Sequence, residues 1–284
     1  MRYAGLFSLC LCGTLALSGC NQGMTDEEVD QAIKDVNVID ETNLNNVMLT
    51  VADPNEAVTY FKRTIVANPD RIDLRRGLAI SLIRARKPRE AVKAWEDVLT
   101  MPEAGHADRV EYTDALIRDN QWEKAEAQLD QIPPTHETFK RYRLEAMVAD
   151  SNKEWDKADS FYETAVGLTT KPSGTLNNWG YSKLTRGEYN EAEKLFAEAL
   201  TYNASLFTAK NNLVLARAAQ RKYDMPVVDM TQTEHAQLLY TAALSAIKQG
   251  DINTGKSLLS EAISTHPQHF DAAVRSLEAL ENAA

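Results

Sequence analysis

One short stretch of the sequence matches a pattern whose chemistry is known. Residues 250–257, Gly-Asp-Ile-Asn-Thr-Gly-Lys-Ser, satisfy G-x-x-x-x-G-K-[ST], the loop that cradles nucleotide phosphates. Such a loop works where a buried β-strand leads into a helix, because backbone N–H groups and the helix N-terminus then surround the phosphates. Residues 237–249 are rich in Ala and Leu and lack a β-branched run, so they predict a helix instead. Since no Asp follows a hydrophobic strand to hold Mg²⁺, we expect no nucleotide site at Lys256.

Other residue types that could do chemistry are scattered. The five histidines are His106, His136, His235, His266 and His269. His266 and His269 are three residues apart, but Pro267 separates them and no third metal ligand is near. No G-x-S-x-G sequence occurs, and the three cysteines, Cys10, Cys12 and Cys20, all lie at the start of the chain. The sequence therefore indicates a protein that is not an enzyme and has no cofactor or metal.

The N-terminus has the layout of an export signal. Arg2 precedes an apolar run over residues 4–17, which has the length of a signal-peptide core and is shorter than the ~20 residues that span a bilayer. The run ends in Leu17-Ser18-Gly19-Cys20, which resembles a bacterial lipobox. This resemblance implies that residues 1–19 are a lipoprotein signal peptide and that the Cys20 thiol receives a diacylglycerol. The alternatives are an ordinary secretory signal with a stray cysteine and a buried N-terminal helix.

The residues after Cys20 bear on location. In bacterial lipoproteins Asp at the next position favours retention in the inner membrane, so Asn21 predicts an outer-membrane anchor facing the periplasm. Residues 20–37 hold five acidic residues against Lys34, which indicates a solvated acidic tether. The whole chain has 31 Lys+Arg and 41 Asp+Glu, a net charge of −10, and no basic cluster. Nucleic acid would be repelled, and membrane attachment is expected only through the N-terminus.

The strongest signal is an internal repeat. Alanines recur at steps of 34, 34, 33 and 34 residues; these repeat alanines are Ala57, Ala91, Ala125, Ala158 and Ala192. A large side chain stands four residues after each; these repeat anchors are Phe61, Trp95, Leu129, Tyr162 and Phe196. The period predicts stacked helix pairs, because a small residue lets two helices approach closely and a large one fills the groove between neighbouring pairs.

This pattern resembles the tetratricopeptide repeat (TPR), a family whose 34-residue unit carries Ala at its twentieth position, an aromatic at its twenty-fourth and Pro near its end. Residues 173–206 are the best unit, with Trp179-Gly180 at its seventh and eighth positions. The resemblance implies an all-α fold, a right-handed superhelical solenoid of antiparallel helix pairs. We predict that this array covers residues 38–224.

The sixth unit departs from the pattern. Its first helix is predicted over residues 208–221, but Pro226 falls where the repeat alanine should be, and proline removes a backbone donor and clashes with the preceding turn. We therefore expect an irregular excursion over residues 225–233. The array then resumes, so that residues 234–284 form a final TPR and a capping helix. In this register Gly250 is the turn between two helices and Gly255 is the small packing residue.

The fold would offer a groove lined by the first helix of each pair, the face that TPR proteins use to hold peptides or partner helices. The family's groove positions fall here on Arg76, Ile80, Ile83, Arg143, Met147, Asn177, Tyr181, Asn211 and Leu215. Plain solvent-facing residues are the alternative reading of these positions. The tryptophans, Trp95, Trp122, Trp155 and Trp179, mostly coincide with positions that pack between helices, so we expect them in the core.

The complete layout suggests a more specific family. A lipobox, an acidic tether, an interrupted TPR array and a final block ending in His-Pro-Gln-His-Phe-Asp-Ala-Ala resemble the TPR lipoproteins of tight-adherence (Flp/Tad) pilus clusters. This resemblance implies a non-catalytic periplasmic scaffold whose protein partners are secretin or pilus-platform subunits. An adaptor for another envelope process, such as outer-membrane protein assembly or the regulation of a peptidoglycan hydrolase or protease, remains the alternative.

Overall fold

The computed structural model describes residues 44–282, and the chain divides into two compact units, residues 1–53 and 54–284. In the first unit the described part holds a helix at residues 44–50. The predicted signal peptide, Cys20, the tether and the predicted start of the array at residue 38 lie outside the described residues. None of the described helices combines the length and the apolar character that crossing a membrane requires.

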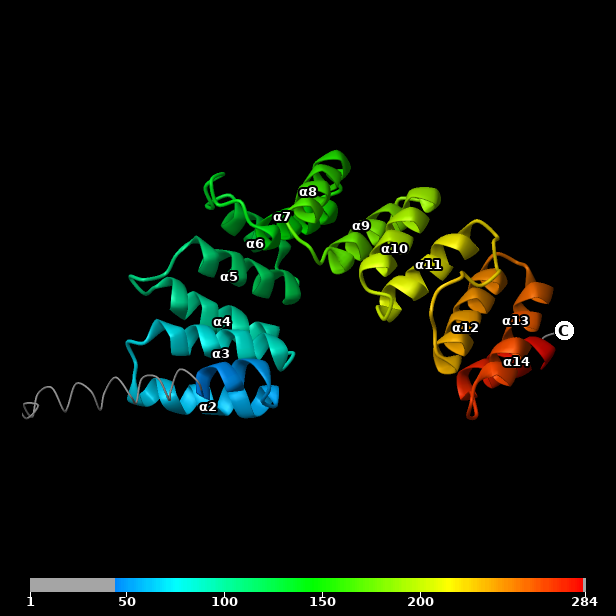
Figure 1. Cartoon of the computed structure of the whole chain (residues 1–284), viewed down its shortest axis with the longest axis horizontal. Coiled ribbons are helices and arrows are strands. Elements are labelled where there is room, and N and C mark those ends of the chain that lie inside the picture. The colour runs from blue at the N-terminus through cyan, green and yellow to red at the C-terminus, as the bar shows by residue number, and fades with distance from the viewer. Residues whose placement is uncertain (1–43, 283–284) are drawn as a thin grey trace, which may run out of the picture. The chain divides into compact units, whose positions relative to one another are not determined.

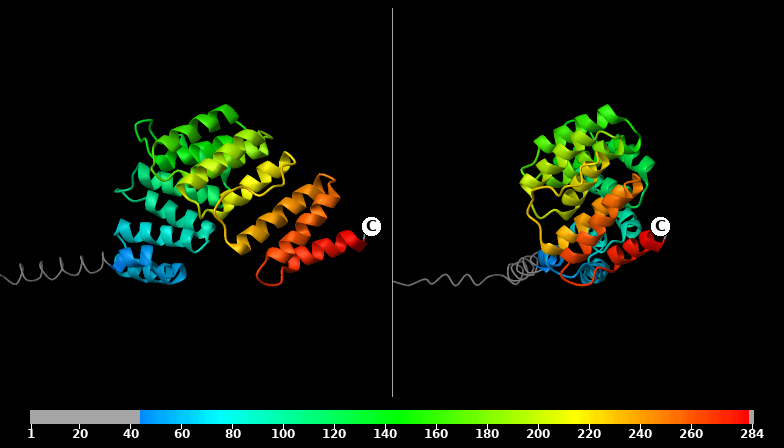
Figure 2. Two further views of the ribbon diagram at one scale, coloured as in Figure 1. Left: turned by 45° about the vertical axis from the view of Figure 1, so that its right-hand side comes forward. Right: turned by 90° about the vertical axis from the view of Figure 1, so that its right-hand side faces the viewer.

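The second unit is a succession of antiparallel helices (Figure 1). In chain order they are α2 (Pro54–Ala67), α3 (Ile72–Arg84), α4 (Pro88–Leu99), α5 (His106–Arg118), α6 (Trp122–Leu129), α7 (Phe139–Ser151), α8 (Trp155–Gly167), α9 (Ser173–Thr185), α10 (Tyr189–Tyr202), α11 (Phe207–Ala219), α12 (Gln232–Lys248), α13 (Ile252–Thr265) and α14 (Asp271–Asn282). Each helix packs on the next one in the chain, as the two views of Figure 2 also show. The helices form the pairs α3–α4, α5–α6, α7–α8 and α9–α10, and we call the first member of each pair, together with α11, a first helix. The first helices α5, α7, α9 and α11 also contact one another, each packing against the next in this order.

The repeat positions form the core of this unit. All five repeat alanines have an exposed fraction of 0%, and the repeat anchors are at most 2% exposed. The closeness of the packing is visible at Gly180 on α9, where a Cβ atom would lie 2.7 Å from a ring carbon of Phe196 on α10. The predicted all-α repeat packing is therefore confirmed, because each pair buries its own small and large residues against its neighbours.

The turn directly after α3, α5, α7, α9, α11 and α12 uses a left-handed residue. Four of these residues carry side chains: Arg86, Asn120, Lys153 and Arg221, with φ between 58° and 63°. Gly187 and Gly250 hold the corresponding places with φ of 82° and 81°. The turn closes the preceding helix by two backbone bonds; in the first case Arg86 N–H donates to Ile83 and Lys87 N–H donates to Leu82. The predicted turn role of Gly250 is confirmed.

The sixth pair lacks its second helix, and the interruption begins earlier than predicted. α11 ends at Ala219 rather than at residue 221, and no helix occurs until Gln232, so the irregular stretch is 220–231 rather than 225–233. Arg221 already has the left-handed conformation that ends a helix. Tyr223, Met225 and Met230 pack against the apolar cluster of α12 and α13, which explains why the stretch stays close to the array. Val227 is fully exposed.

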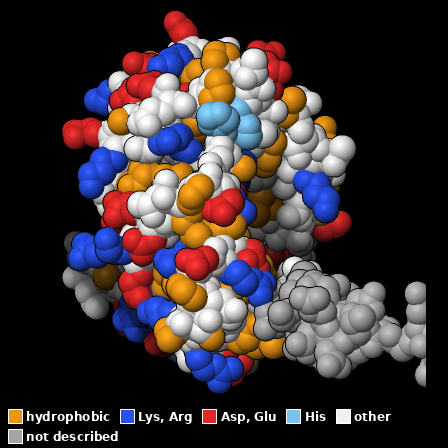
Figure 3. Space-filling view, turned by 90° about the vertical axis from the view of Figure 1, so that its left-hand side faces the viewer, with side chains coloured by type: hydrophobic (Ala, Val, Ile, Leu, Met, Phe, Trp, Pro, Cys, Tyr) orange, Lys and Arg blue, Asp and Glu red, His pale blue; other side chains and the backbone are white. Residues whose placement is uncertain are grey.

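Ion pairs connect neighbouring helices, and some of the charged groups in them are buried. Lys140 on α7 reaches Glu111 (2.6 Å) and Asp114 (2.9 Å) on α5, and Lys210 on α11, which is 3% exposed, reaches Glu234 on α12 at 3.2 Å. Glu234 also closes a capping box with Thr231 at the start of α12. Figure 3 shows acidic and basic side chains interspersed on one face of the molecule rather than gathered by sign.

Candidate functional site

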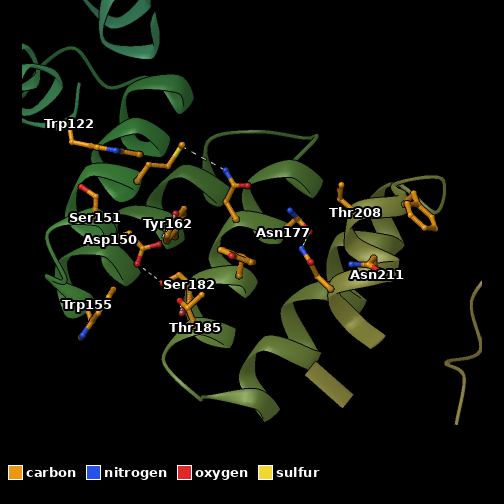
Figure 4. A pocket seen from close by; sticks show the side chains of 15 residues that line it. Trp122, Asp150, Ser151, Trp155, Tyr162, Asn177, Ser182, Thr185, Thr208 and Asn211 are labelled. Atoms are coloured by element: carbon orange, nitrogen blue, oxygen red, sulfur yellow. Dashed lines mark hydrogen bonds between the residues drawn. The ribbon is translucent and has the colours of Figure 1, made fainter. Parts of the chain in front are cut away.

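A groove of about 590 Å³ lies along the first helices α7, α9 and α11 (Figure 4). Its apolar and aromatic side chains are Trp122, Met147, Trp155, Tyr162, Tyr181 and Phe207. Its amides and hydroxyls are Ser151, Asn177, Asn178, Ser182, Thr185, Thr208, Asn211 and Asn212, and it also contains Asp150. The size and the mixed lining suit one or two large side chains of a ligand together with hydrogen bonds to its polar groups.

Helical spacing brings these residues to one face. On α9 the steps from Asn178 to Tyr181 or Ser182, and from there to Thr185, are three and four residues, which places the side chains along one side of the helix. Because α7, α9 and α11 occupy the same position in successive repeats, the corresponding sides of the three helices face the same groove. The groove is thus a product of the repeat register.

Four amides lie at the α9–α11 end of the groove. Asn212 donates from Nδ2 to Oδ1 of Asn177 at 3.1 Å, and Asn178 directs its Nδ2 to the Met147 sulfur at 3.8 Å. Oδ1 of Asn211 accepts from the Thr241 hydroxyl at 2.8 Å. These bonds orient the side chains, while the amide nitrogens of Asn177 and Asn211 have no partner among the described residues. An extended peptide offers carbonyl groups that such nitrogens could bind.

Asp150 lies at the other end, on the last turn of α7. Its Oδ1 accepts from the Ser182 hydroxyl at 2.5 Å and its Oδ2 from the Tyr162 hydroxyl at 3.3 Å. Burial raises the pKa of the Asp150 carboxyl, and burial together with the neighbouring carboxylate also raises the pKa of the Tyr162 hydroxyl. The carboxylate is therefore held by neutral donors in a partly desolvated place.

The predicted groove positions divide into two groups. Met147, Asn177, Tyr181 and Asn211 all line the groove, and Tyr181 is 53% exposed there. These four come from the fourth, fifth and sixth repeats and were predicted from the groove positions of the TPR family. The remaining predicted positions lie elsewhere on the first helices.

The side chains at those remaining positions pack against other residues or form ion pairs. The Arg76 guanidinium is held by Asp108, and Ile80 and Ile83 pack against the apolar cluster of the N-terminal repeats. Arg143 lies over the ring of Phe139 at 5.6 Å. Leu215 is partly buried on α11 and is not among the groove residues.

The tryptophans were predicted to belong to the core. Trp95 is 1% exposed, Trp179 packs against the cluster around Tyr162, and Trp122 packs against the apolar cluster of the N-terminal repeats. Trp122 and Trp155 also line the groove. Each is the first residue of a second helix, directly after the turn, where a side chain can reach back to the first-helix face. That shared position was the available signal in the sequence.

The stretch that matches the phosphate-loop pattern is a helix–turn–helix. α12 ends at Lys248, Gly250 makes the turn, and α13 begins at Ile252. Gly255 is buried, and a Cβ there would lie 2.4 Å from Cγ1 of Ile247, so its predicted packing role is confirmed. The strand that a phosphate loop requires is replaced by a helix. Within residues 44–282 no group of three or more potential metal ligands occurs.

The comparisons with known proteins agree with a TPR fold. No protein-family model matches the chain. The curated tetratricopeptide repeat protein 21B of Mus musculus is 27% identical over 124 residues, which are 40% of this chain but only 9% of that protein's length. Three solved structures share the fold at low sequence identity, and we describe them next.

A chain of the APC/C hetero-tetramer Cut9-Hcn1 has a TM-score of 0.60 at 13% identity, with 83% of this chain and 48% of that chain covered. A TPR protein from Parabacteroides merdae ATCC 43184 has a TM-score of 0.51 at 13% identity, with 89% of this chain and 98% of that chain covered. Human IFIT1, in the dimer with PPP-AAAA, has a TM-score of 0.55 at 14% identity, with 80% of this chain and 59% of that chain covered. The chain therefore has the TPR solenoid fold.

Proposed function

We propose that this protein is a non-catalytic scaffold that holds a segment of a protein partner in the groove of α7, α9 and α11. The observation that carries the proposal is the composition of that groove, in which aromatic side chains stand beside oriented amides. Aromatic surfaces bind apolar side chains of a peptide, and the amides bind its backbone. This combination is suited to holding a peptide segment, and the Ser182 hydroxyl and the Asp150 carboxylate in the lining are bonded to each other.

Two tyrosines allow a matched test. Tyr181 lies in the groove and is 53% exposed, whereas Tyr202 is 54% exposed at the end of α10 and is not a groove residue. Replacing either by Ala removes a similar exposed ring, so both variants should fold equally well. Partner capture by the tagged full chain from envelope extracts should fall at least fivefold for Tyr181→Ala and stay unchanged for Tyr202→Ala. Equal capture by the two variants would place partner binding outside the groove.

We further propose that the scaffold acts in the cell envelope, anchored to the outer membrane through a lipidated Cys20 and facing the periplasm. The lipobox-like residues 17–20 and Asn21 support this location. The likeness in layout to the Flp/Tad lipoproteins supports secretin or pilus-platform subunits as partners. Capture by the full chain, analysed by mass spectrometry, should recover these subunits. Recovery of a peptidoglycan hydrolase or protease alone would contradict the pilus assignment while leaving the scaffold function intact.

A further inference from the structure

The groove carries one formal charge. Asp150 is the only acidic residue in its lining, and no Lys, Arg or His occurs there. A groove built to hold a C-terminal carboxylate or an acidic segment would need cations to pair with carboxylates. The charge of this groove is therefore opposite to that expected for an acidic ligand.

The charge of Asp150 has no ion-pair partner in the described part of the chain. Its two hydrogen-bond donors, Ser182 and Tyr162, are neutral. The charge of Arg186 lowers the pKa of Asp150 in part, but Arg186 forms its ion pair with a different residue. Its Nη2 lies 2.7 Å from the Asp159 carboxylate, and its side chain is 7% exposed. Its guanidinium packs over the Trp155 ring at 5.2 Å. A carboxylate that is partly desolvated and unpaired attracts a cation more strongly than one in bulk water.

Aromatic rings complete the surroundings of this carboxylate. Tyr162 is hydrogen-bonded to it, and Trp122 and Trp155 line the same end of the groove in Figure 4. Aromatic faces attract ammonium and guanidinium groups and also pack against the methylene stems that carry them. Arg186 already lies over the Trp155 ring and Tyr162 is 1% exposed, so Trp122 is the ring at this end that no cation of the described residues covers. The combination of one carboxylate and this ring is suited to Lys or Arg.

We propose that the occupant of the groove is an extended segment of a protein partner that carries a Lys or Arg side chain, whose charge pairs with Asp150 while the amides at the α9–α11 end bind the segment's backbone. This inference rests on the proposed function and names the chemistry of its partner. The protein's own residues 20–37 do not fit as an occupant, since they hold five acidic residues and one Lys. The net charge of −10 also steers basic partners toward the protein.

A pool of octapeptides with blocked termini and randomised sequence is the probe. The full chain in detergent is incubated with the pool, and bound peptides are sequenced by mass spectrometry. We expect Lys and Arg together to be enriched at least threefold over the input and Asp and Glu to be depleted. For the most enriched peptide, replacing its basic residue by norleucine should weaken binding at least fivefold, measured by fluorescence anisotropy.

Asp150→Asn tests the residue itself. The amide oxygen can still accept from Ser182, so the fold should persist, and the difference between the basic and the norleucine peptide should disappear in this variant. Asp229→Asn removes an equal charge from an exposed position between α11 and α12 and should keep that difference. Circular dichroism melting of both variants checks that folding is intact.

The outcomes separate the two proposals. Peptides that are enriched without a basic preference, and that are lost in Tyr181→Ala, would overturn the cation inference and leave the groove function standing. A fivefold preference for the basic peptide that survives in Asp150→Asn would likewise overturn the role of Asp150. No enrichment of any peptide would overturn both the inference and the groove as the binding site.

Discussion

Arg76 on α3 and Asp108 on α5 form a two-point ion pair between the first helices of adjacent repeats. Nε of Arg76 lies 2.6 Å from Oδ1 of Asp108, and Nη2 lies 2.8 Å from Oδ2. Asp108 is 4% exposed, and its Oδ2 also accepts the Gly105 N–H at 2.8 Å, so the same carboxylate caps the start of α5. A residue predicted to face a ligand therefore has a structural role between repeats.

Arg76→Met should lower the free energy of unfolding by roughly 1.5–3 kcal/mol, because the buried Asp108 would lose its cationic partner while keeping its charge. Urea unfolding followed by circular dichroism measures the change. Arg89→Met is the control, since Arg89 is exposed on α4 and has no ion pair among the described residues; it should change stability by less than about 0.5 kcal/mol. Similar losses in both variants would mean that the ion pair contributes nothing.

The left-handed turn residues predict a stabilising substitution. Lys153 is exposed with φ of 63°, a conformation that costs an ordinary residue about 1–2 kcal/mol and glycine almost nothing. Lys153→Gly should therefore raise the free energy of unfolding by about 0.5–1 kcal/mol, after the greater entropy of the unfolded glycine is subtracted. The reverse change at the equivalent place, Gly187→Ala, should lower it by about 1 kcal/mol. Thermal melting of both variants measures these stability changes, and a lower Tm for Lys153→Gly than for the unchanged protein would contradict the prediction.

Gly255 and Lys256 are adjacent but should respond differently. Gly255→Val should destabilise the protein by about 2 kcal/mol, because the new side chain would overlap Ile247 on α12. Lys256→Ala should leave stability within about 0.5 kcal/mol, since no interaction of its side chain occurs among the described residues. Calorimetric titration with ATP and Mg²⁺ should give no heat for either variant or for the wild type. An ATP affinity that Lys256→Ala abolishes would contradict the packing role of this segment.

Asp159 on α8 should contribute a pH-dependent part of the stability. Burial acts to raise its pKa, but hydrogen bonds from Arg186, Lys183 and Trp179 outweigh this effect and hold the pKa below its usual range. A lowered folded-state pKa stabilises the protein above the unfolded pKa of about 3.9, and this contribution is lost as the pH falls through the folded-state value. Asp159→Asn should therefore cost about 1–3 kcal/mol at pH 7 and progressively less below about pH 4.

Asp150→Asn is the contrasting case for that measurement. Burial raises the pKa of Asp150, so its charge opposes folding above the folded-state pKa, and the substitution should be neutral or slightly stabilising at pH 7. Urea unfolding of both variants at pH 7 and pH 3 compares the two carboxyls. If both substitutions destabilise equally at pH 7, the distinction between a paired and an unpaired carboxylate is wrong.

Lipidation of Cys20 can be tested against a neighbouring cysteine. When the full sequence is expressed in a bacterial host that processes lipoproteins, the product should partition into Triton X-114, because buried acyl chains contribute about 0.8 kcal/mol per CH₂ group. Cys20→Ser should move it to the aqueous phase, whereas Cys12→Ser should not change partitioning. Detergent partitioning that persists in Cys20→Ser would show that another feature holds the protein on the membrane.

The sequence by itself determined the repeat and its core. The repeat alanines and anchors could be identified from their period, because each pair of helices buries these positions against its immediate neighbours. Gly250 and Gly255 were explained in the same way, through register with the fifth repeat. The prediction that the sixth repeat is interrupted rested on the local chemistry of Pro226. The left-handed Arg221 follows Gly187 by one repeat period and makes the regular turn after α11, and the second helix is missing only beyond it.

Only the tertiary structure decided which first-helix residues form a groove. Arg76 and Tyr181 are both on first helices, yet one is bound by an acid 32 residues further along the chain and the other stays 53% exposed. Trp122 and Trp155 join the groove from second helices, and Asp150 faces it without a cation. Each of these outcomes depends on which side chains meet across separate repeats. A pattern with a 34-residue period describes what the repeats share, whereas a binding site arises from the residues in which they differ.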